Sequence, residues 1–305
     1  MAIANNFRPA KSITKESVQV GQFEWFYRES LPGYSKNESS KPASDSSAQA
    51  PPVVCLHGLV SQSYSWRNTL PAIAAETGRR AIAPDWLGMG FSERPDKFDF
   101  PYTPEAFLEG LEQFLDALEI EACVLVAQGF LGSVGIQFAL RNPDRIERLV
   151  ICNAPISTEH KVPFKIRQMG WPFIGDMITQ DPLLVDRTLE GGGPYQVADE
   201  DLDVYRRPYL QTSDTGRALL ATVKRLDLPT ITAEIQDGLA QWEKTTLMIW
   251  GISDPWLPVE SIEAIAASLK DGKLVKLEEV GHYVQEDWFE KVNEALIPFL
   301  RQQLV

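Results

Sequence analysis

Short apolar runs alternate with helix-like segments along most of the chain. Six runs have the character of buried strands, and they lie at 51–56, 79–85, 121–127, 145–155, 245–251 and 273–281. The helix-like segments, with apolar residues at helical spacing, lie at 63–77, 107–118, 130–142, 261–269 and 288–304. Alternation of this kind predicts an α/β fold, with a mostly parallel central sheet and helices on both faces.

The N-terminal part of the chain departs from this pattern. Residues 1–16 read as a polar lead-in, and residues 17–29 contain VQV and FEWFY, which suit two short strands. Residues 35–50 are almost all small and polar. Because such a segment buries too little apolar surface to offset the entropy lost on ordering, we expect a flexible, Ser-rich surface loop there.

The alternation is interrupted once, at about 156–243. This stretch is rich in proline and aromatic residues and contains helix-like pieces. We interpret it as a helical cap inserted after the sixth strand, above the carboxyl edge of the sheet, where ligands bind in open α/β folds. The expected organisation is one core domain built from residues 1–155 and 244–305, with residues 156–243 as the cap.

Composition narrows the possible partners and location. The 305 residues include 29 basic and 42 acidic residues, a net charge of −13, which makes nucleic acid and anionic lipid surfaces poor partners. No apolar run approaches the roughly 18 residues of a membrane span. The three cysteines each lie inside an apolar run, which argues against a disulfide framework and favours a reducing, cytoplasmic location. No Cys/His cluster suggests a metal site, and no motif suggests a cofactor.

Candidate catalytic residues follow the ends of predicted strands. The chain has only three histidines, His57, His160 and His282. His57 follows the first buried strand, Asp254 follows the strand at 245–251, and His282 follows the strand at 273–281. A histidine is the usual side chain for proton transfer near neutral pH, so this short list limits the candidates for a general base.

Several motifs, in order, resemble those of the α/β-hydrolase superfamily across about residues 17–303. The segments SYSWRNTLP and APDWLGMGFSERP are most similar to those of the haloalkane dehalogenase and epoxide hydrolase branch. The set GPY, VYRRPYL, WGISDPWLP and GHYVQEDW resembles a dehalogenase-like group of plants and cyanobacteria. The resemblance implies an α/β-hydrolase fold with a cap, and a catalytic triad at the carboxyl edge of the sheet.

The nucleophile that this resemblance requires is missing. The superfamily places a Ser, Asp or Cys on a tight strand-to-helix turn, written G-x-S-x-G. In the matching segment, Val126 to Gly132, the nucleophile position falls on Gly129, which has no side chain. Ser133 lies one helical turn further on, where its hydroxyl should bond the carbonyl four residues back. Ser61 and Ser92 lie in loops at the same edge, where capping a loop is the simpler role.

The resemblance implies roles for the remaining residues. Asp254 and His282 take the positions of the acid and the base, which gives a degenerate triad of Gly129, Asp254 and His282. The backbone N–H groups of Leu59 and Phe130 would form the oxyanion hole. The residues expected to line the substrate pocket are Gln128, Trp86, Phe91 and Trp171.

Other polar motifs admit structural explanations. We expect His57 to brace its loop and His160 to be solvated at the entrance to the cap. Arg206 and Arg207 could bind a carboxylate or phosphate, but pairing with nearby acidic residues is favoured. The glycines of GGGPY at 191–195 more often mark a turn that needs positive φ than a phosphate cradle.

Two classes of function remain open. Dehalogenation and epoxide opening through an alkyl-enzyme both need a carboxylate at position 129, and neither Phe130 nor Leu59 offers a side-chain donor for a halide. One hypothesis is general-base chemistry by His282 on a small apolar substrate, which includes direct hydrolysis, a lyase reaction or cofactor-free oxygen chemistry. The other is a catalytically inactive protein that binds or senses a small apolar molecule under the cap.

Overall fold

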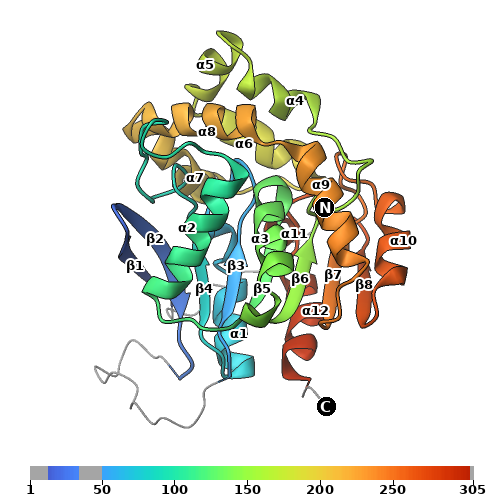
Figure 1. Cartoon of the computed structure of the whole chain (residues 1–305). Helices are drawn as coiled ribbons and strands as arrows, with labels where there is room; N and C mark the ends of the chain where they lie inside the picture. The colour runs from blue at the N-terminus through green and yellow to red at the C-terminus, as the bar shows by residue number, and fades with distance from the viewer. Residues whose placement is uncertain (1–12, 34–49, 303–305) are drawn as a thin grey trace.

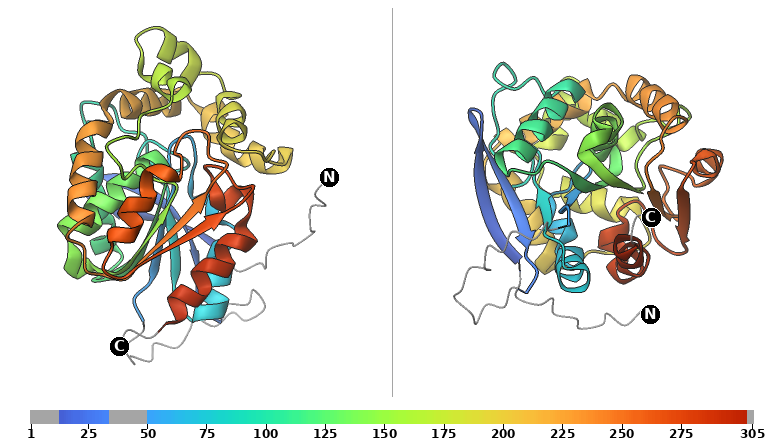
Figure 2. Two further views of the ribbon diagram at one scale, coloured as in Figure 1. Left: turned by 90° about the vertical axis from the view of Figure 1, so that its right-hand side faces the viewer. Right: turned by 60° about the horizontal axis from the view of Figure 1, so that its bottom comes forward.

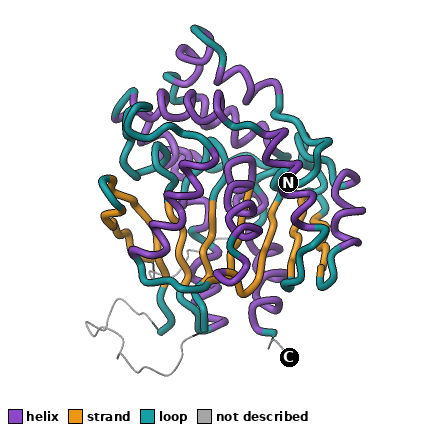
Figure 3. Tube along the Cα trace, in the orientation of Figure 1, coloured by secondary structure: helices purple, strands orange, loops and turns teal. Residues whose placement is uncertain are grey.

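A computed structural model describes residues 13–33 and 50–302, and it shows one sheet between two helical layers (Figures 1 and 3). The eight strands lie in the order β1-β2-β4-β3-β5-β6-β7-β8. They are β1 Ile13–Val20, β2 Phe23–Ser30, β3 Val53–Leu56, β4 Ala81–Pro84, β5 Cys123–Gln128, β6 Ile146–Cys152, β7 Thr246–Gly251 and β8 Gly272–Leu277. Only the β1–β2 and β2–β4 pairs are antiparallel, so the predicted mostly parallel sheet is confirmed.

The first strand corrects the prediction for the N-terminal residues. β1 begins at Ile13, inside the segment that was expected to be a polar lead-in, and it pairs with β2 from Ile13 opposite Ser30 to Val20 opposite Phe23. Backbone pairing at the edge of a sheet does not require apolar side chains on both faces. A search of the sequence for apolar runs therefore does not find a polar edge strand. The loop predicted at 35–50 lies outside the described residues, apart from its last residue.

Each face of the sheet has its own apolar core, as the side-chain alternation of strands requires. On β5, Leu125 and Ala127 face one cluster, and Val124 and Val126 face the other. The first cluster is covered by α2 (Pro104–Ala117), α3 (Gly129–Arg141) and α10 (Glu260–Ser268), and the second by α1 (Thr69–Thr77) and α12 (Phe289–Arg301). The central strands are therefore packed against helices on both faces.

The segment between β6 and β7 is helical. It contains α4 Phe164–Arg167, α5 Ile174–Thr179, α6 Leu184–Leu189, α7 Asp199–Gln211, α8 Asp214–Arg225 and α9 Leu228–Leu239. Figures 1 and 2 show α4 to α8 above the carboxyl ends of the strands. α9 instead lies beside α3, where Glu234 accepts hydrogen bonds from Gln137 and Arg141 at 2.6 Å. The last helix of the segment is thus part of the layer that covers the sheet.

A buried ionic cluster joins the cap to the core. Arg67, just after a short 3₁₀ helix at Ser63–Trp66, donates two hydrogen bonds of 2.7 Å to Glu286 of α11 (Val284–Asp287). The same guanidinium donates to Asp201 of the cap helix α7 at 2.8 Å, and Tyr205 of α7 donates to Glu286 at 2.6 Å. These bonds fix α7 over the segment that follows His282.

The strand order reverses between β3 and β5, because the chain runs from β3 to β4 on one side and to β5 on the other. Open α/β sheets bind ligands in the crevice at such a switch point. His57 and Gly58 follow β3, and Gly129 follows β5. The fold therefore brings the two motifs to the position where a ligand site is expected.

Candidate active site

Gly129 lies at the tight turn between β5 and α3. Its φ is +72°, in the left-handed region where a residue with a Cβ is strained. An ideal Cβ built on Gly129 would lie 3.3 Å from Nε2 of His282 and 3.0 Å from the Cα of Gly58. A side chain at this position would thus point at the imidazole, as a nucleophile does, but the backbone of Gly58 crowds the space where it would begin.

His282 and Asp254 form a buried pair. Nδ1 of His282 lies 2.8 Å from Oδ2 of Asp254, and both side chains are almost fully inaccessible to solvent. An ionised carboxylate only accepts hydrogen bonds, so the neutral imidazole carries its proton on Nδ1. Nε2 then offers a lone pair on the side of Gly129, and among the described residues no hydrogen bond occupies it.

Asp254 is held by further donors. Its Oδ1 accepts from the backbone N–H groups of Trp256 at 2.8 Å and Leu257 at 3.2 Å, and its Oδ2 accepts from Asn153 at 2.8 Å. Asn153 is itself fixed by two hydrogen bonds with the backbone of Gly251. Asn153 was not among the predicted site residues, although a polar residue directly after the apolar run LVIC at the carboxyl edge was a usable signal.

Aromatic rings enclose the imidazole. The Phe130 ring is stacked on that of His282 with centroids 5.4 Å apart, and the rings of Trp256 and Tyr283 lie at 4.8 and 4.9 Å. Such surroundings exclude bulk water and strengthen the electrostatic interaction with Asp254. Neither Trp256 nor Tyr283 was singled out from the sequence.

The residues proposed for the oxyanion hole lie beside this pair. Leu59 is buried, and its carbonyl accepts a hydrogen bond of 3.1 Å from the Tyr283 hydroxyl. Phe130 is the second residue of α3, where backbone N–H groups lack helical partners. Within residues 13–33 and 50–302, the N–H groups of Leu59 and Phe130 donate to no other residue. Their role in stabilising an oxyanion stays a prediction.

The side chain of Gln128, which was expected to line the pocket, is hydrogen-bonded at both ends of its amide. Its Nε2 donates to the carbonyl of His282 at 2.9 Å, and its Oε1 accepts from the N–H of Gly58 at 3.2 Å. Gln285 also approaches Oε1 at 3.4 Å. Gln128 is therefore a bridge that sets the distance between the His282 loop and the Gly58 loop.

The aromatic residues expected in the pocket have other contacts. Trp86 is fully buried between Trp25 and Phe107, and its indole donates to the carbonyl of His57 at 3.0 Å. Phe91 packs against Phe26 at 5.3 Å, and Trp171 contacts Phe164 on the partly exposed surface of the cap. Their expected role in lining a substrate pocket stays a prediction. Large aromatic side chains suit a core as well as a pocket, and the sequence pattern cannot separate the two.

The three candidate serines differ in their surroundings. Ser133 donates to the carbonyl of Phe130 at 2.6 Å, three residues back rather than the four expected, and so stays on its own helix. Ser92 donates to the carbonyl of Asp85 and accepts from the N–H of Phe26, which fixes its loop. Ser61 is buried, and its hydroxyl has no partner among the described residues.

The other two histidines have structural roles. His57 contacts the carbonyl of Gly58 at 2.8 Å and accepts from the N–H of Trp86 at 3.2 Å, as expected of a residue that braces a loop. The expectation of a solvated His160 is wrong. His160 is buried beside Trp250 and bonded to Ser261 at 2.6 Å, and burial lowers its pKa to about 4. The ring of His160 stacks on Trp250, and its Nδ1 accepts hydrogen bonds from the backbone. The position of His160 in the sequence did not reveal these contacts.

Arg206 pairs with carboxylates, as favoured from the sequence. It donates to Asp186 of α6 at 2.6 and 2.8 Å and to Asp203 at 2.9 Å, and the hydrogen bond to Asp186 raises the pKa of the guanidinium. Arg207 is exposed. Arg206 therefore ties two cap helices together instead of facing a ligand.

The glycine run of the cap corrects another expectation. None of Gly191, Gly192 and Gly193 has a positive φ. The carbonyl of Gly192 accepts the N–H of His282 at 2.7 Å, and a Cβ on Gly192 would lie 2.8 Å from the Tyr283 ring. Glycine is needed here because the cap backbone approaches the His282 loop closely, a second contact that fixes the candidate base.

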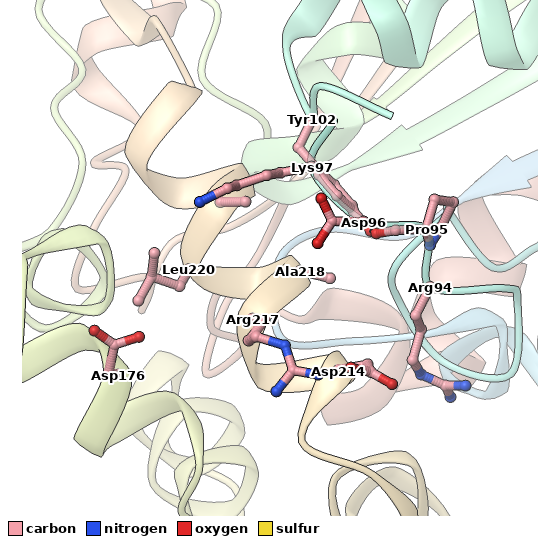
Figure 4. A pocket seen from close by; sticks show the side chains of 11 residues that line it. Arg94, Pro95, Asp96, Lys97, Tyr102, Asp176, Asp214, Arg217, Ala218 and Leu220 are labelled. Atoms are coloured by element: carbon pink, nitrogen blue, oxygen red, sulfur yellow. Dashed lines mark hydrogen bonds and ion pairs between the residues drawn. The ribbon is translucent and has the colours of Figure 1, made fainter. Parts of the chain in front are cut away.

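A cavity of about 410 Å³ lies elsewhere, between the cap and the loop after β4. Figure 4 shows Arg94, Lys97 and Tyr102 from that loop and Asp176 and Arg217 from the cap around it. Gly129 and His282 do not line it. Across the described ranges, no group of three or more His, Cys, Asp or Glu residues could hold a metal ion. No helix within these ranges is long and apolar enough to cross a membrane.

Known proteins share this architecture. A family model described as alpha/beta hydrolase fold matches residues 51–288. A haloalkane dehalogenase of Mesorhizobium japonicum is 27% identical over 272 residues, which cover 84% of this chain and 86% of its own. Haloalkane dehalogenase 2 of Mycobacterium tuberculosis is 27% identical over 257 residues, 81% of this chain and 87% of its own.

Solved structures of haloalkane dehalogenases are also similar to this chain. The crystal structure of haloalkane dehalogenase DbeA from Bradyrhizobium elkani has a TM-score of 0.77 and 25% identity, over 94% of this chain and 97% of its own. The family model covers most of the chain, including the strands from β3 to β8. The protein belongs to the α/β-hydrolase family and, within that family, resembles the haloalkane dehalogenases.

Proposed function

We propose that this protein performs general-base chemistry on a small apolar substrate, without a covalent enzyme intermediate. The observation that carries the proposal is the position of His282. Its Nδ1 is bonded to Asp254 at 2.8 Å, and its Nε2 lies 3.3 Å from the place where a Cβ of residue 129 would be. The base is thus oriented toward a nucleophile position that holds no side chain.

In the hydrolytic form of this reaction, water takes the place of the missing nucleophile. Nε2 of His282 removes a proton from a water molecule as its oxygen attacks the carbonyl carbon of an ester or lactone. The N–H groups of Leu59 and Phe130 stabilise the oxyanion that forms. Collapse of the intermediate breaks the bond to the leaving oxygen, which takes the proton back from Nε2. A positioned general base contributes about 10²–10⁴ in rate, so the proposed activity is modest.

We infer that halide release is not the reaction, although the relatives carry the name haloalkane dehalogenase. Displacement of a halide needs a carboxylate nucleophile, and position 129 has none. The side chains of Phe130 and Leu59 contain no polar hydrogen that could bind the departing halide. We expect no bromide release from a bromoalkane.

One observation favours a second function, that of a binding protein. The Cα atoms of Gly58 and Gly129 approach so closely that an ideal Cβ on either glycine would meet the Cα of the other at about 3 Å. The rings of Phe130, Trp256 and Tyr283 also cover the imidazole. This packing offers an apolar wall for a ligand and little room for a bulky reacting group.

A substrate screen separates the two functions. Esters, lactones and epoxides are incubated with the wild type, His282→Ala and His160→Ala, which changes a buried histidine that does not face Gly129. General-base chemistry predicts turnover that His282→Ala lowers by at least about 10²-fold, while folded His160→Ala retains it. Equal turnover by His282→Ala would overturn the proposal. An unreacted small molecule recovered from the purified protein, without turnover of that molecule, would favour binding.

A further inference from the structure

The outer end of the cap carries a group of exposed, large apolar side chains. Nine such residues occur among residues 13–33 and 50–302, and five of them lie within α4, α5 and the turn between them. Figure 1 shows these two helices as the part of the cap farthest from the sheet. We call this group the cap-tip surface, and its members are Phe164, Trp171, Phe173, Ile174 and Met177.

The most exposed member has an unusual backbone conformation. Phe173 is 88% exposed and has a φ of +64°, a conformation that a residue with a Cβ rarely adopts. Met177 is 71% exposed on the next turn of α5. Strained residues of this kind cluster at functional sites.

The charge of this region is opposite to that of the whole chain. From 161 to 177, the last residue of the cap-tip surface, the sequence contains three basic residues and one acidic residue, Asp176, in a protein of net charge −13. Lys161, Lys165 and Arg167 are all exposed, and within the described part of the chain none of them forms an ion pair. The guanidinium of Arg167 lies over the Phe164 ring at 5.7 Å, so the charge directly borders the apolar surface.

We propose that the cap-tip surface docks on a lipid bilayer with anionic headgroups. Aromatic residues and methionine enter the boundary between headgroups and acyl chains, and basic residues at their border contact lipid phosphates. The net charge of the chain predicted that anionic lipid surfaces are poor partners, and the proposal revises that prediction for the cap tip alone, because ions screen charges over about 8 Å at physiological ionic strength. The acidic residues of the core thus contribute little at the cap tip. This inference is independent of the chemistry at His282.

Vesicle binding tests the proposal. The full chain is sedimented with vesicles of phosphatidylcholine alone and of phosphatidylcholine mixed with phosphatidylglycerol, at low and high salt. We expect binding to the anionic vesicles that high salt weakens. Phe173→Ser with Met177→Ser should lower partitioning more than about tenfold, from the lost burial of two large apolar side chains. Lys165→Glu and Arg167→Glu should each lower it at least about fivefold.

A matched pair of variants controls for general loss of apolar surface. Ile174 and Ile252 are 42% and 40% exposed, but only Ile174 belongs to the cap tip. Ile174→Ser should weaken vesicle binding and Ile252→Ser should not, with melting curves to show that both are folded. Absence of wild-type binding at low salt would overturn the proposal. So would dimerisation without lipid that Phe173→Ser abolishes, because the surface would then serve a second copy of the chain.

Discussion

Nε2 of His282 lies 3.3 Å from the point where a Cβ of Gly129 would be. This relationship makes position 129 testable. Gly129→Ser should give slow ester hydrolysis above the wild-type level, because the new hydroxyl is formed within reach of an oriented base. The φ of +72° and the 3.0 Å approach to Gly58 should lower the free energy of unfolding by about 2–3 kcal/mol. A chromogenic ester and urea unfolding measure the two effects.

Gly129→Ala is the control for this change. It carries the same backbone strain and the same contact with Gly58 but has no nucleophile, so it should lose comparable stability and gain no activity. Equal hydrolysis by the two variants would show that the serine does not act as a nucleophile.

Asp254→Asn should reverse the tautomer of His282. Oδ2 of Asp254 now accepts from Nδ1 of the imidazole and from Asn153, and an amide nitrogen in that place cannot accept from either. If the amide oxygen takes the place of Oδ1, where it accepts from the N–H groups of Trp256 and Leu257, the amide nitrogen faces Nδ1. Nδ1 then becomes an acceptor and the proton moves to Nε2, which can no longer take a proton. The same change in a serine-protease triad lowers kcat about 10⁴-fold.

Nitrogen-15 spectra of the imidazole check the tautomer directly, and the turnover of any substrate found in the screen checks the consequence. An unchanged tautomer in a folded Asp254→Asn would contradict the assigned role of Asp254.

Asp287 should make stability fall as pH rises. Burial raises the pKa of its carboxyl group from 3.8 to about 7, with smaller contributions from Glu286 and Asp254, while the hydrogen bond from the N–H of Gly281 lowers it. Between pH 4 and 7 the folded state then binds more protons at this site than the unfolded state. The site's favourable contribution is complete below about pH 4 and is lost as pH rises through 7.

Asp287→Asn keeps an acceptor for Gly281 and removes the charge. Relative to the wild type it should gain about 2–4 kcal/mol between pH 4 and pH 8. Urea unfolding at the two pH values measures the difference, with the exposed Asp237→Asn as the control. A difference that does not depend on pH would contradict the raised pKa.

Arg67→Met should destabilise the junction between cap and core by about 3–5 kcal/mol, because it leaves the buried carboxylate of Glu286 without its cation. Arg301→Met is a matched control, since its pair with Glu76 is about half exposed and should contribute less than about 1 kcal/mol. Thermal unfolding compares the two. If the two variants lost equal stability, burial would not strengthen the ion pair between Arg67 and Glu286.

The sheet was predictable because its central strands are continuous apolar runs, buried on both faces. Asp254 and His282 were predictable as neighbours for the same reason, since β7 and β8 are adjacent and parallel and both residues follow their carboxyl ends. Chain order along a parallel sheet thus carries three-dimensional information.

The surroundings of the site were not predictable to the same degree. Gln128 could have pointed into a pocket, and only the positions of Gly58 and the His282 carbonyl show that both ends of its amide are bonded. Trp86 and His160 are buried by contacts with residues far away in the sequence. No local sequence pattern determines which apolar residues an aromatic ring will contact.

The hydrogen bond from the N–H of His282 to the carbonyl of Gly192 makes the environment of the imidazole depend on the position of the cap. A ligand that lifts the glycine run would stretch this bond and change the surroundings of the ring. With only three histidines in the chain, the ring resonances of His282 can be assigned by substituting the other two. A solution spectrum could therefore report the arrival of an unknown ligand before that ligand has been identified.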